Sequence, residues 1–461
     1  MKINFIKLLY EEENNMKNNK GITLVALVVT IVVLLILAGV SINLVLGNNG
    51  IIAKAKDAET KSAEASQNDL KGMNGLVSEM EGALAGNGGT GGSGAGTKVP
   101  AEATAETAPY FPDNTFTKKE GTIDTGLVIQ DASGNEYVWV VVPKSLYNNA
   151  DYNSNNAKKP SSSTDYANIE YCLQKYTATY RESDYSDTHE ADTNNVGWLT
   201  SDEYTELKNS MLKSVYENGG FYVGRYEAGI DTTTGTNRTS NTDKNSDGKY
   251  TMPSTTPVTK ADAYPYTYVT RTQAQNLASN VNSGTKTSSL MFGVQWDLVL
   301  AFMSKDTEKI NQDTLEELIS NSTTIGNYYN STFDLNRGKY AQKGQLGNPW
   351  KNFDSALGSI VVKNESTGKM KKTEQSSDSN GILLTTGGTE QSNVMNIYDI
   401  AGNVWEWTLE KNSDTSRSCA RGGGYNNVGS YFTAVVRNSN SIDYTYNQRF
   451  PCFTFLGKAE C

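Results

Sequence analysis

The longest apolar run in the chain lies near its N-terminus. No charged residue occurs from Gly21 to Ala53, and Val, Leu and Ile dominate residues 22–46. The hydrocarbon core of a bilayer is about 30 Å thick and is crossed by about 20 apolar helical residues, so this run is long enough to span a membrane. A secretory signal peptide is the alternative, but the run is longer than a signal-peptide core and no A-x-A site follows it directly. The pattern predicts a single-pass membrane protein.

A polar helix and a flexible linker follow the apolar run. Residues 54–84 are rich in Ala, Glu and Lys and place Leu70, Met73, Leu76 and Met80 three or four positions apart, which predicts a helical stripe. Residues 86–96 (GNGGTGGSGAG) have almost no side chains to bury and are typical of a tether. The predicted organisation is a leader (1–21), a membrane helix with its stalk (22–85), a linker that includes the small residues 101–109 (86–109), and one folded domain (110–461).

Short strands and turns alternate within the predicted domain. The pattern of residues 126–142 predicts two strands around a turn at residues 133–135. Residues 147–192 are polar and rich in Tyr, which favours surface loops, whereas residues 200–216 predict a helix. Residues 243–248 (DKNSDG) match the first half of a calcium-binding EF-hand loop. Because the twelfth position of that loop is Ser254 instead of Glu, a polar turn is the favoured interpretation.

Composition excludes several classes of protein. The 461 residues carry a formal charge of -10, and no Lys/Arg cluster follows the apolar run, which argues against a nucleic-acid partner. The single histidine, His189, leaves little material for zinc sites or for Ser/His and Cys/His catalysis. The four cysteines form no CxxC pair, and a disulfide between Cys452 and Cys461 is one option outside the cell.

The start of the apolar run resembles the processing site of a type IV prepilin. Lys20 and Gly21 end a basic leader, and Ile22 begins the hydrophobic helix. The resemblance implies cleavage after Gly21, methylation of Ile22, and display outside a bacterial cytoplasmic membrane, with other pilin subunits as possible partners. Type IV pilins carry Glu at the position held here by Ala26, so a minor, initiating or tip subunit fits the sequence better than the main subunit of a long pilus.

Three separated segments resemble formylglycine-generating-enzyme, or sulfatase-modifying-factor, domains. They are residues 220–228 (GFYVGRYEA), residues 289–300 (SLMFGVQWDLVL), and residues 396–408 (NIYDIAGNVWEWT) with the following ARGGGY at 420–425. The resemblance covers the chain from about residue 126 to its end. It implies an α+β domain of the C-type lectin-like fold, in which 220–228 is a strand and 289–300 leads into a helix.

The Gly-Asn turn and the strand after it are a candidate metal site. In a strand, Trp405 and Trp407 face one side and Val404 and Glu406 the other, so the tryptophans can anchor a core while Glu406 is free to bind. Related domains bind calcium near this turn, which suggests Asn403 and Glu406 as oxygen ligands of calcium. A hydrogen-bonded turn without an ion is the alternative.

The resemblance does not extend to the oxidase chemistry of that family. Formylglycine-generating enzymes hold copper with two cysteines that follow the Arg-Gly-Gly turn. Residues 424–448 of this chain contain no cysteine, since Cys419 precedes the turn and Cys452 lies beyond it. A Cu(I) site needs soft thiolate ligands close together, so no copper is expected. We therefore expect a non-catalytic domain.

The C-terminal segment, residues 421–449, has the composition of a binding surface. Tyr gives a large contact area at low entropic cost, and small polar residues adapt to a partner. Variable proteins of diversity-generating retroelements are similar in domain type, motif order and terminal composition. The resemblance implies that the Tyr, Asn and Ser positions of the segment vary, between a constant scaffold that includes Arg421, Gly422, Gly423, Ala434 and Arg437. The candidate ligand-binding residues are Tyr425, Asn426, Asn427, Ser430, Tyr431, Asn438, Asn440, Tyr444 and Tyr446.

The sequence therefore favours a surface-displayed adhesin or receptor that binds an extracellular protein or glycan through its C-terminal face. Two other classes of protein stay open. One is a structural minor pilin or pseudopilin, whose head only packs into an assembly. The other is an enzyme of altered chemistry on the same fold.

Overall fold

The computed structural model describes residues 102–281, 286–306, 320–347, 349–413 and 417–441, the single residues 318 and 415, and the backbone of residues 455–458. The chain divides into two compact units, Met1–Gly94 and Ala95–Cys461, and every described residue belongs to the second. The apolar run, the stalk, and the processing residues Gly21 and Ile22 lie outside the described residues. Within the described part, no helix is both long enough and apolar enough to cross a bilayer.

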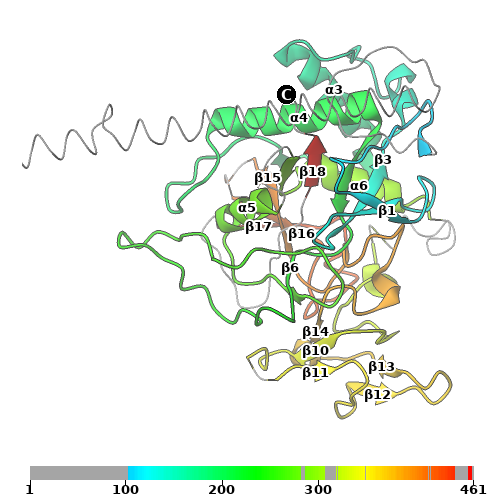
Figure 1. Cartoon of the computed structure of the whole chain (residues 1–461), viewed down its shortest axis with the longest axis vertical. Helices are drawn as coiled ribbons and strands as arrows, with labels where there is room; N and C mark the ends of the chain where they lie inside the picture. Colours follow the sequence, from blue (N-terminus) through cyan, green and yellow to red (C-terminus); the bar gives the residue numbers. More distant parts are fainter. Residues whose placement is uncertain are drawn as a thin grey trace, which may run out of the picture. The chain divides into compact units, whose positions relative to one another are not determined.

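The described helices are packed around the main sheet (Figure 1). They are α3 (Ser163–Tyr176), α4 (Ser201–Asn218), α5 (Arg271–Asn280) and α6 (Gly293–Met303), with 3-10 turns η2 (Lys144–Asn148), η3 (Ala178–Tyr180), η4 (Ser322–Thr324), η5 (Asp378–Asn380) and η6 (Glu390–Ser392). The predicted helix at 200–216 is α4. It begins at a capping box, in which the Thr200 and Glu203 side chains each accept from the other's backbone N–H, and it ends at Gly219 in the left-handed conformation.

An antiparallel sheet of six strands contains both the first strands of the domain and its last one. Its order is β1 (Thr117–Glu120), β2 (Val128–Gln130), β3 (Glu136–Val141), β5 (Gly220–Gly224), β18 (Phe455–Lys458) and β8 (Lys286–Ser289). The predicted hairpin at 126–142 is confirmed as β2–β3, and the predicted strand at 220–228 is confirmed as β5. The C-terminal strand β18 pairs with β5 and β8, so the end of the chain returns to the middle of the sheet.

A second sheet and several small ones complete the mixed helix-and-strand domain, which confirms the α+β class. The second sheet has the order β17 (Arg437–Asn440), β16 (Ser418–Arg421), β15 (Glu406–Asn412), β4 (Tyr185–Ser186). The small sheets are β6 (Gly229–Ile230) with β7 (Tyr264–Pro265), β11 (Lys351–Asn352) with β10 (Lys339–Gln342) and β14 (Ile382–Leu384), and β12 (Val361–Lys363) with β13 (Met370–Lys372) and β9 (Phe333–Asp334).

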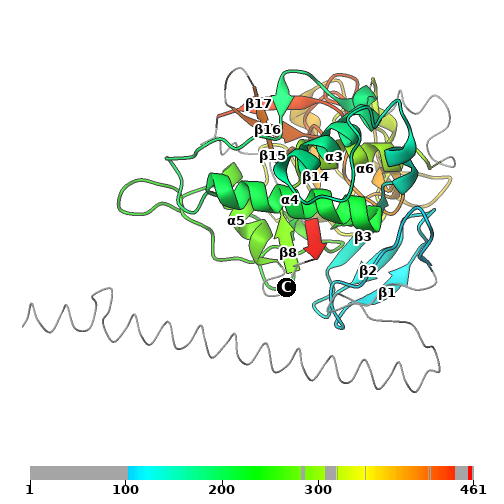
Figure 2. The same ribbon diagram turned by 90° about the horizontal axis from the view of Figure 1, so that it is seen from above.

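Helix α6 lies at the centre of the core. All of its side chains are buried, and it contacts β3 of the first sheet, β15 of the second, and α3. Trp296 of α6 donates from its indole N–H to the carbonyl of Ala434, at 2.9 Å. Helix α4 lies beside α3 and packs on β5 and β18 (Figures 1 and 2). The helix expected after residue 289 is therefore present, and it joins the two sheets.

Two parts of the predicted organisation need correction. Residues 147–192, expected to be surface loops, include α3, whose Ile169, Cys172 and Leu173 are buried in the main core. The end of the predicted linker also packs on the domain. Thr107 donates to the carbonyl of Gly219 and accepts from the Trp139 indole, each at 2.8 Å. These contacts bury hydroxyl and indole groups that a free linker would leave in water.

Candidate ligand-binding segment and buried carboxylates

The C-terminal segment starts with a turn that requires glycine. Strand β16 ends at Arg421, and Gly422 and Gly423 follow with φ of 87° and 79°. A Cβ on Gly422 would lie 2.7 Å from the carbonyl oxygen of Ile400, and one on Gly423 would lie 2.4 Å from that of Phe432. The positive φ and the close backbone contacts both exclude a larger side chain. The turn therefore places the following loop in one defined position.

A buried ionic cluster fixes both ends of that loop. It consists of Arg421 on β16, Arg437 on β17, Asp297 on α6 and Glu410 on β15, and all four side chains are buried. Arg437 donates to both oxygens of Asp297, at 2.9 and 2.8 Å, and to Glu410, at 2.8 Å. Arg421 donates to Asp297 at 2.9 Å and to Glu410 at 3.3 Å. The two arginines neutralise the two acids, and the partly buried Arg181 lies 3.5 Å from Asp297 as a third cation.

Four of the candidate ligand-binding side chains are buried. They are Tyr425, Asn426, Asn427 and Asn440. Tyr425 belongs to an apolar cluster with Leu383 and Val404, and the amide oxygen of Asn427 accepts from the Trp405 indole at 2.8 Å. This corrects the expectation that these side chains form an exposed face. The loop folds back on the tryptophans that precede it, which the composition of the segment does not reveal.

The tip of the loop is the exposed part. Tyr431 is 79% exposed, more than any other exposed large hydrophobic residue in the described part of the chain, and Ser430 beside it is also exposed. The backbone there is held in place, because Gly429 donates to the Asn330 side chain at 3.0 Å and accepts from the Ser322 backbone at 2.9 Å. Asn438 on β17 is half-buried. Tyr444 and Tyr446 lie outside the described residues.

The strand after the Gly-Asn turn contains a buried carboxylate without hydrogen-bond donors. Trp405 and Trp407 lie in the main core and Val404 lies in a separate cluster, as the strand alternation predicts. Glu406 is fully buried, and neither of its oxygens has a hydrogen-bond partner among the described residues. Burial raises the pKa of Glu406 well above its usual value, and the nearby Glu227 and Asp399 raise it further. A charged Glu406 therefore needs neutralising by a proton or a cation.

Asn403 is fully engaged by protein groups. Its side-chain oxygen accepts from the Asn327 amide at 2.9 Å and from the Leu384 backbone at 3.1 Å. Its amide nitrogen donates to Glu227 at 2.7 Å, and the backbone of Val404 also donates to Glu227, at 3.3 Å. Asn403 itself has a φ of 52°, which Asn tolerates better than most residues. The Gly-Asn turn is therefore also a hydrogen-bonded structural turn.

These contacts determine which side-chain oxygens are available as ligands of a calcium ion. Calcium takes six to eight oxygen ligands. The orphaned oxygens of Glu406 suit it, but the oxygen of Asn403 already accepts two hydrogen bonds in this conformation. Within the described ranges, no group of three His, Cys, Asp or Glu side chains is arranged to hold a metal ion. Calcium at Glu406 stays a prediction, and any further ligands would come from groups other than the Asn403 oxygen.

The described cysteines are both free and buried. Cys172 lies on α3 and Cys419 on β16. Burial raises the pKa of the Cys172 thiol to about 12 and that of Cys419 well above its usual value, which disfavours the thiolate form that binds soft metals. Cys452 and Cys461 lie outside the described residues.

Sequence reasoning missed three residues that organise this region: Asp297, Glu410 and Glu227. Asp297 offered a signal, because it is the one charged residue on a mostly apolar helix and a buried acid needs a partner. Glu410 follows the Trp-Glu-Trp motif on the same strand and gave no distinct signal. Glu227 lies in the segment 220–228, yet its partner Asn403 is 176 positions away, so no local pattern connects them.

Comparison with known proteins adds no relative. No protein-family model matches the sequence, and no curated protein matches it either.

Proposed function

We propose that this chain is a surface-displayed ligand-binding protein, an adhesin or receptor, which binds a protein or glycan through the tip of its C-terminal loop. In this proposal the described domain has the C-type lectin-like fold of the formylglycine-generating-enzyme type. The N-terminal apolar helix, processed between Gly21 and Ile22, carries the domain outside a bacterial membrane, as a minor or tip pilin-like subunit. The domain itself is not an enzyme.

The observation that carries the proposal is the exposure of Tyr431. A tyrosine that is 79% exposed lies at the tip of a loop whose two ends are fixed by buried Arg421 and Arg437. A rigid aromatic side chain presented on a fixed backbone loses little conformational entropy on binding, which is why tyrosine dominates evolved binding loops. The buried ends tolerate little change, whereas the tip has room for different side chains.

We further propose that the tip is diversified, as in the variable proteins of diversity-generating retroelements, whose mutations are targeted to adenines. Sequencing the gene from many isolates tests this proposal. We expect substitutions at adenines in the codons of Ser430, Tyr431 and Asn438, and none at those of Arg421 and Gly422. A reverse transcriptase gene beside an adenine-mutated near-repeat of these codons should accompany them. Substitutions spread evenly over the domain, with no such neighbour, would exclude the retroelement origin and leave an ordinary adhesin.

A pair of substitutions tests whether Tyr431, unlike Tyr425, contributes nothing to the stability of the loop. Tyr431→Ala should change the free energy of unfolding by less than about 0.5 kcal/mol, since the side chain is exposed. Tyr425→Ala, in the same loop, should cost about 3–5 kcal/mol because it empties a buried site. Denaturant unfolding of both variants measures these values. A large loss for Tyr431→Ala would make that tyrosine a structural residue and remove the basis of the proposal.

A further inference from the structure

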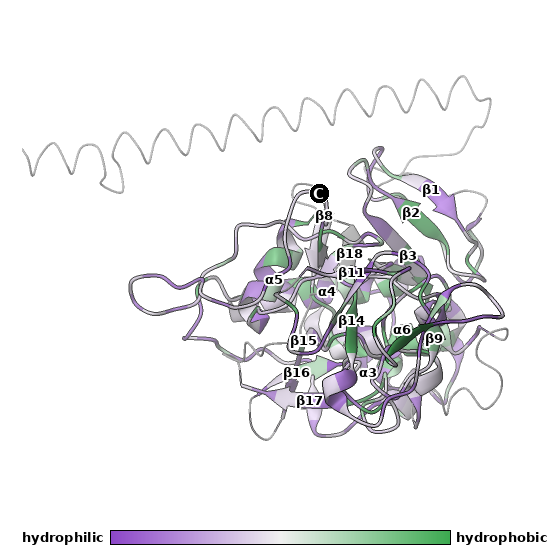
Figure 3. Cartoon of the chain, turned by 90° about the horizontal axis from the view of Figure 1, so that it is seen from below, coloured by the Kyte–Doolittle hydropathy of each residue, from purple (hydrophilic) through white to green (hydrophobic). Residues whose placement is uncertain are grey.

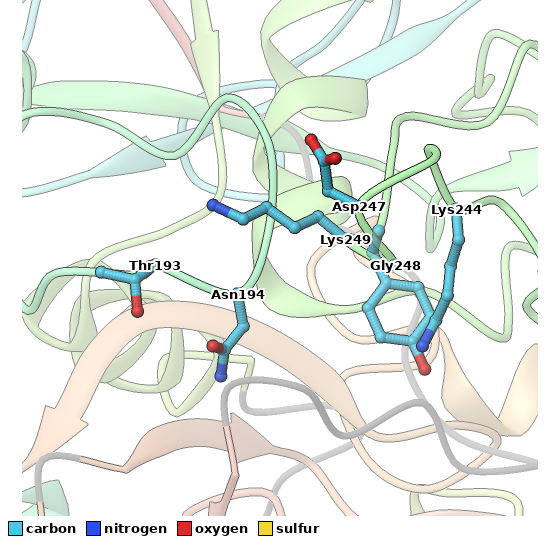
Figure 4. Close-up of a pocket in the computed structure, with 7 residues that line it drawn as sticks. Thr193, Asn194, Lys244, Asp247, Gly248 and Lys249 are labelled. Carbon is cyan, nitrogen blue, oxygen red and sulfur yellow. The ribbon is translucent and has the colours of Figure 1, made fainter.

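A polar pocket of about 320 Å³ lies away from the C-terminal loop. One wall is the loop before α4, with Thr193 and Asn194, and the other is a hairpin formed by residues 244–250 (Figure 4). The hairpin belongs to the long, polar connection between β6 and β7, which is drawn mainly in white and purple in Figure 3. The EF-hand-like residues 243–248 overlap with this hairpin. Asp243, the first of them, forms an ion pair with Arg238 at 2.9 Å.

Hydrogen bonds hold both walls in place. On the hairpin side, the side-chain oxygen of Asn245 accepts from the backbones of Asp247 and Lys249, each at 3.0 Å. On the other side, Asp192 accepts from the Asn194 backbone at 3.0 Å and also from Thr272 of α5.

The two walls are also joined to each other. The Val196 backbone donates to the carbonyl of Tyr250 at 3.1 Å, and Asn195 and Tyr250 form a parallel bridge. A ligand therefore meets a largely preformed site and orders little of the protein when it binds.

The pocket carries a positive charge on an otherwise acidic chain. Two lysines, Lys244 and Lys249, line it with one carboxylate, Asp247. Neither ammonium forms an ion pair with a described residue, and the nitrogen of Lys244 lies 4.1 Å from the centre of the Tyr250 ring. Figure 4 shows Lys249 extended from the hairpin toward the side of Thr193. Two cations against one anion attract a negatively charged ligand, although the whole chain has a charge of -10.

We propose that this pocket binds a carboxylated sugar. The space is much larger than a phosphate ion requires, and no aliphatic side chain of the described residues lines it, so an apolar peptide side chain gains little there. The Thr193 hydroxyl, the Asn194 amide and the Tyr250 ring are the groups that suit sugar hydroxyls and a sugar face, while the lysines suit the carboxylate. The site is separate from the loop tip at Tyr431, so it does not depend on the proposed function.

Calorimetric titration of the full chain in detergent with trigalacturonate tests this site. The same titration is run with the methyl-esterified trisaccharide, which keeps the hydroxyls and loses the charge, and with triaspartate, which keeps only the charge. We expect trigalacturonate to bind and both other probes to bind at least tenfold more weakly. No binding of trigalacturonate, or equal binding of either control probe, would overturn the proposal.

Variants place the binding in this pocket. The double change Lys244→Gln with Lys249→Gln should weaken trigalacturonate binding at least tenfold and leave the thermal unfolding midpoint unchanged, since both side chains are exposed. Lys351→Gln, an exposed lysine on β11, is the matched control and should bind as the original chain does. Tyr431→Ala should also leave this binding intact. Unchanged affinity in the double variant would show that the pocket is not the site.

Discussion

Asp187 shows how one side chain completes a distant helix. Helix α6 begins after Phe292, whose side chain cannot accept hydrogen bonds, and Asp187 supplies the missing acceptor. Its two oxygens accept from the backbones of Gly293 and Val294, at 2.6 and 2.9 Å. A carboxylate at a helix N-terminus is favourable, yet burial raises the pKa of Asp187 to about 7, with further increases from the nearby Glu410 and Glu170.

This raised pKa predicts a pH dependence of stability. The unfolded chain releases the Asp187 proton near pH 4, whereas the folded chain keeps it until about pH 7. The folded state therefore holds more protons between these values, and the contribution of Asp187 to stability falls as the pH rises from about 4 to 7. The Asp187→Asn variant should lack this fall in the free energy of unfolding, which amounts to more than about 1 kcal/mol between pH 4 and pH 7. Denaturant unfolding at several pH values measures the difference, and equal slopes in both proteins would contradict it.

The buried carboxylate of Glu406 leads us to expect that calcium stabilises the folded protein. Because its two buried oxygens have no donor among the described residues, a bound cation would stabilise the fold by neutralising them. Calcium at a hundred times its dissociation constant should add about 2.7 kcal/mol to the free energy of unfolding, and Glu406→Gln should abolish this gain. Thermal unfolding with calcium, and with magnesium as the control, measures it. If calcium leaves the original chain unchanged, a proton on Glu406 is the neutralising partner instead.

At the scale of elements, local patterns predicted the hairpin β2–β3 and helix α4, because each has its turn or cap within a few residues. Helix α3 was not predicted from the sequence, because the apolar residues of its buried face, Ile169, Cys172 and Leu173, lie among polar neighbours. The burial of Tyr425 was not predicted either, because it depends on packing against Leu383, which is far away in the sequence. Motifs located the candidate loop, but only the packing of distant elements separates its buried residues from its exposed tip.

The ionic cluster links four elements, so its loss should affect the whole domain. Arg437→Met removes the arginine that donates to both Asp297 and Glu410 and leaves Arg421 and the more distant Arg181 beside them. Removing one partner from a buried ionic cluster costs about 3–5 kcal/mol. Lys351→Met, on exposed strand β11, should cost less than about 0.5 kcal/mol. Chemical denaturation of both variants gives the two values. Similar small losses would mean that the cluster adds nothing to the stability of the fold.

At the scale of the whole molecule, the second unit has the contacts of an independent domain. Its first sheet includes strand β18, which pairs with both β5 and β8. Near the other end of the unit, Thr107 and Ala108 are buried and donate to the carbonyls of Gly219 and Asn218. The first and last described segments of this unit are therefore tied to one core, which is the property expected of a domain that folds by itself.

Because segments from both sides of the unit pack on one core, we expect a fragment of residues 95–461 to fold alone. We expect a single cooperative thermal transition by circular dichroism, because helix α6 couples the two sheets through one core. Shortening the fragment to end at residue 441 removes β18 and exposes the edges of β5 and β8, so its midpoint should drop by several degrees or its cooperativity should be lost. If both fragments unfold at the same temperature and with the same cooperativity, the pairing of β18 with β5 and β8 does not stabilise the domain.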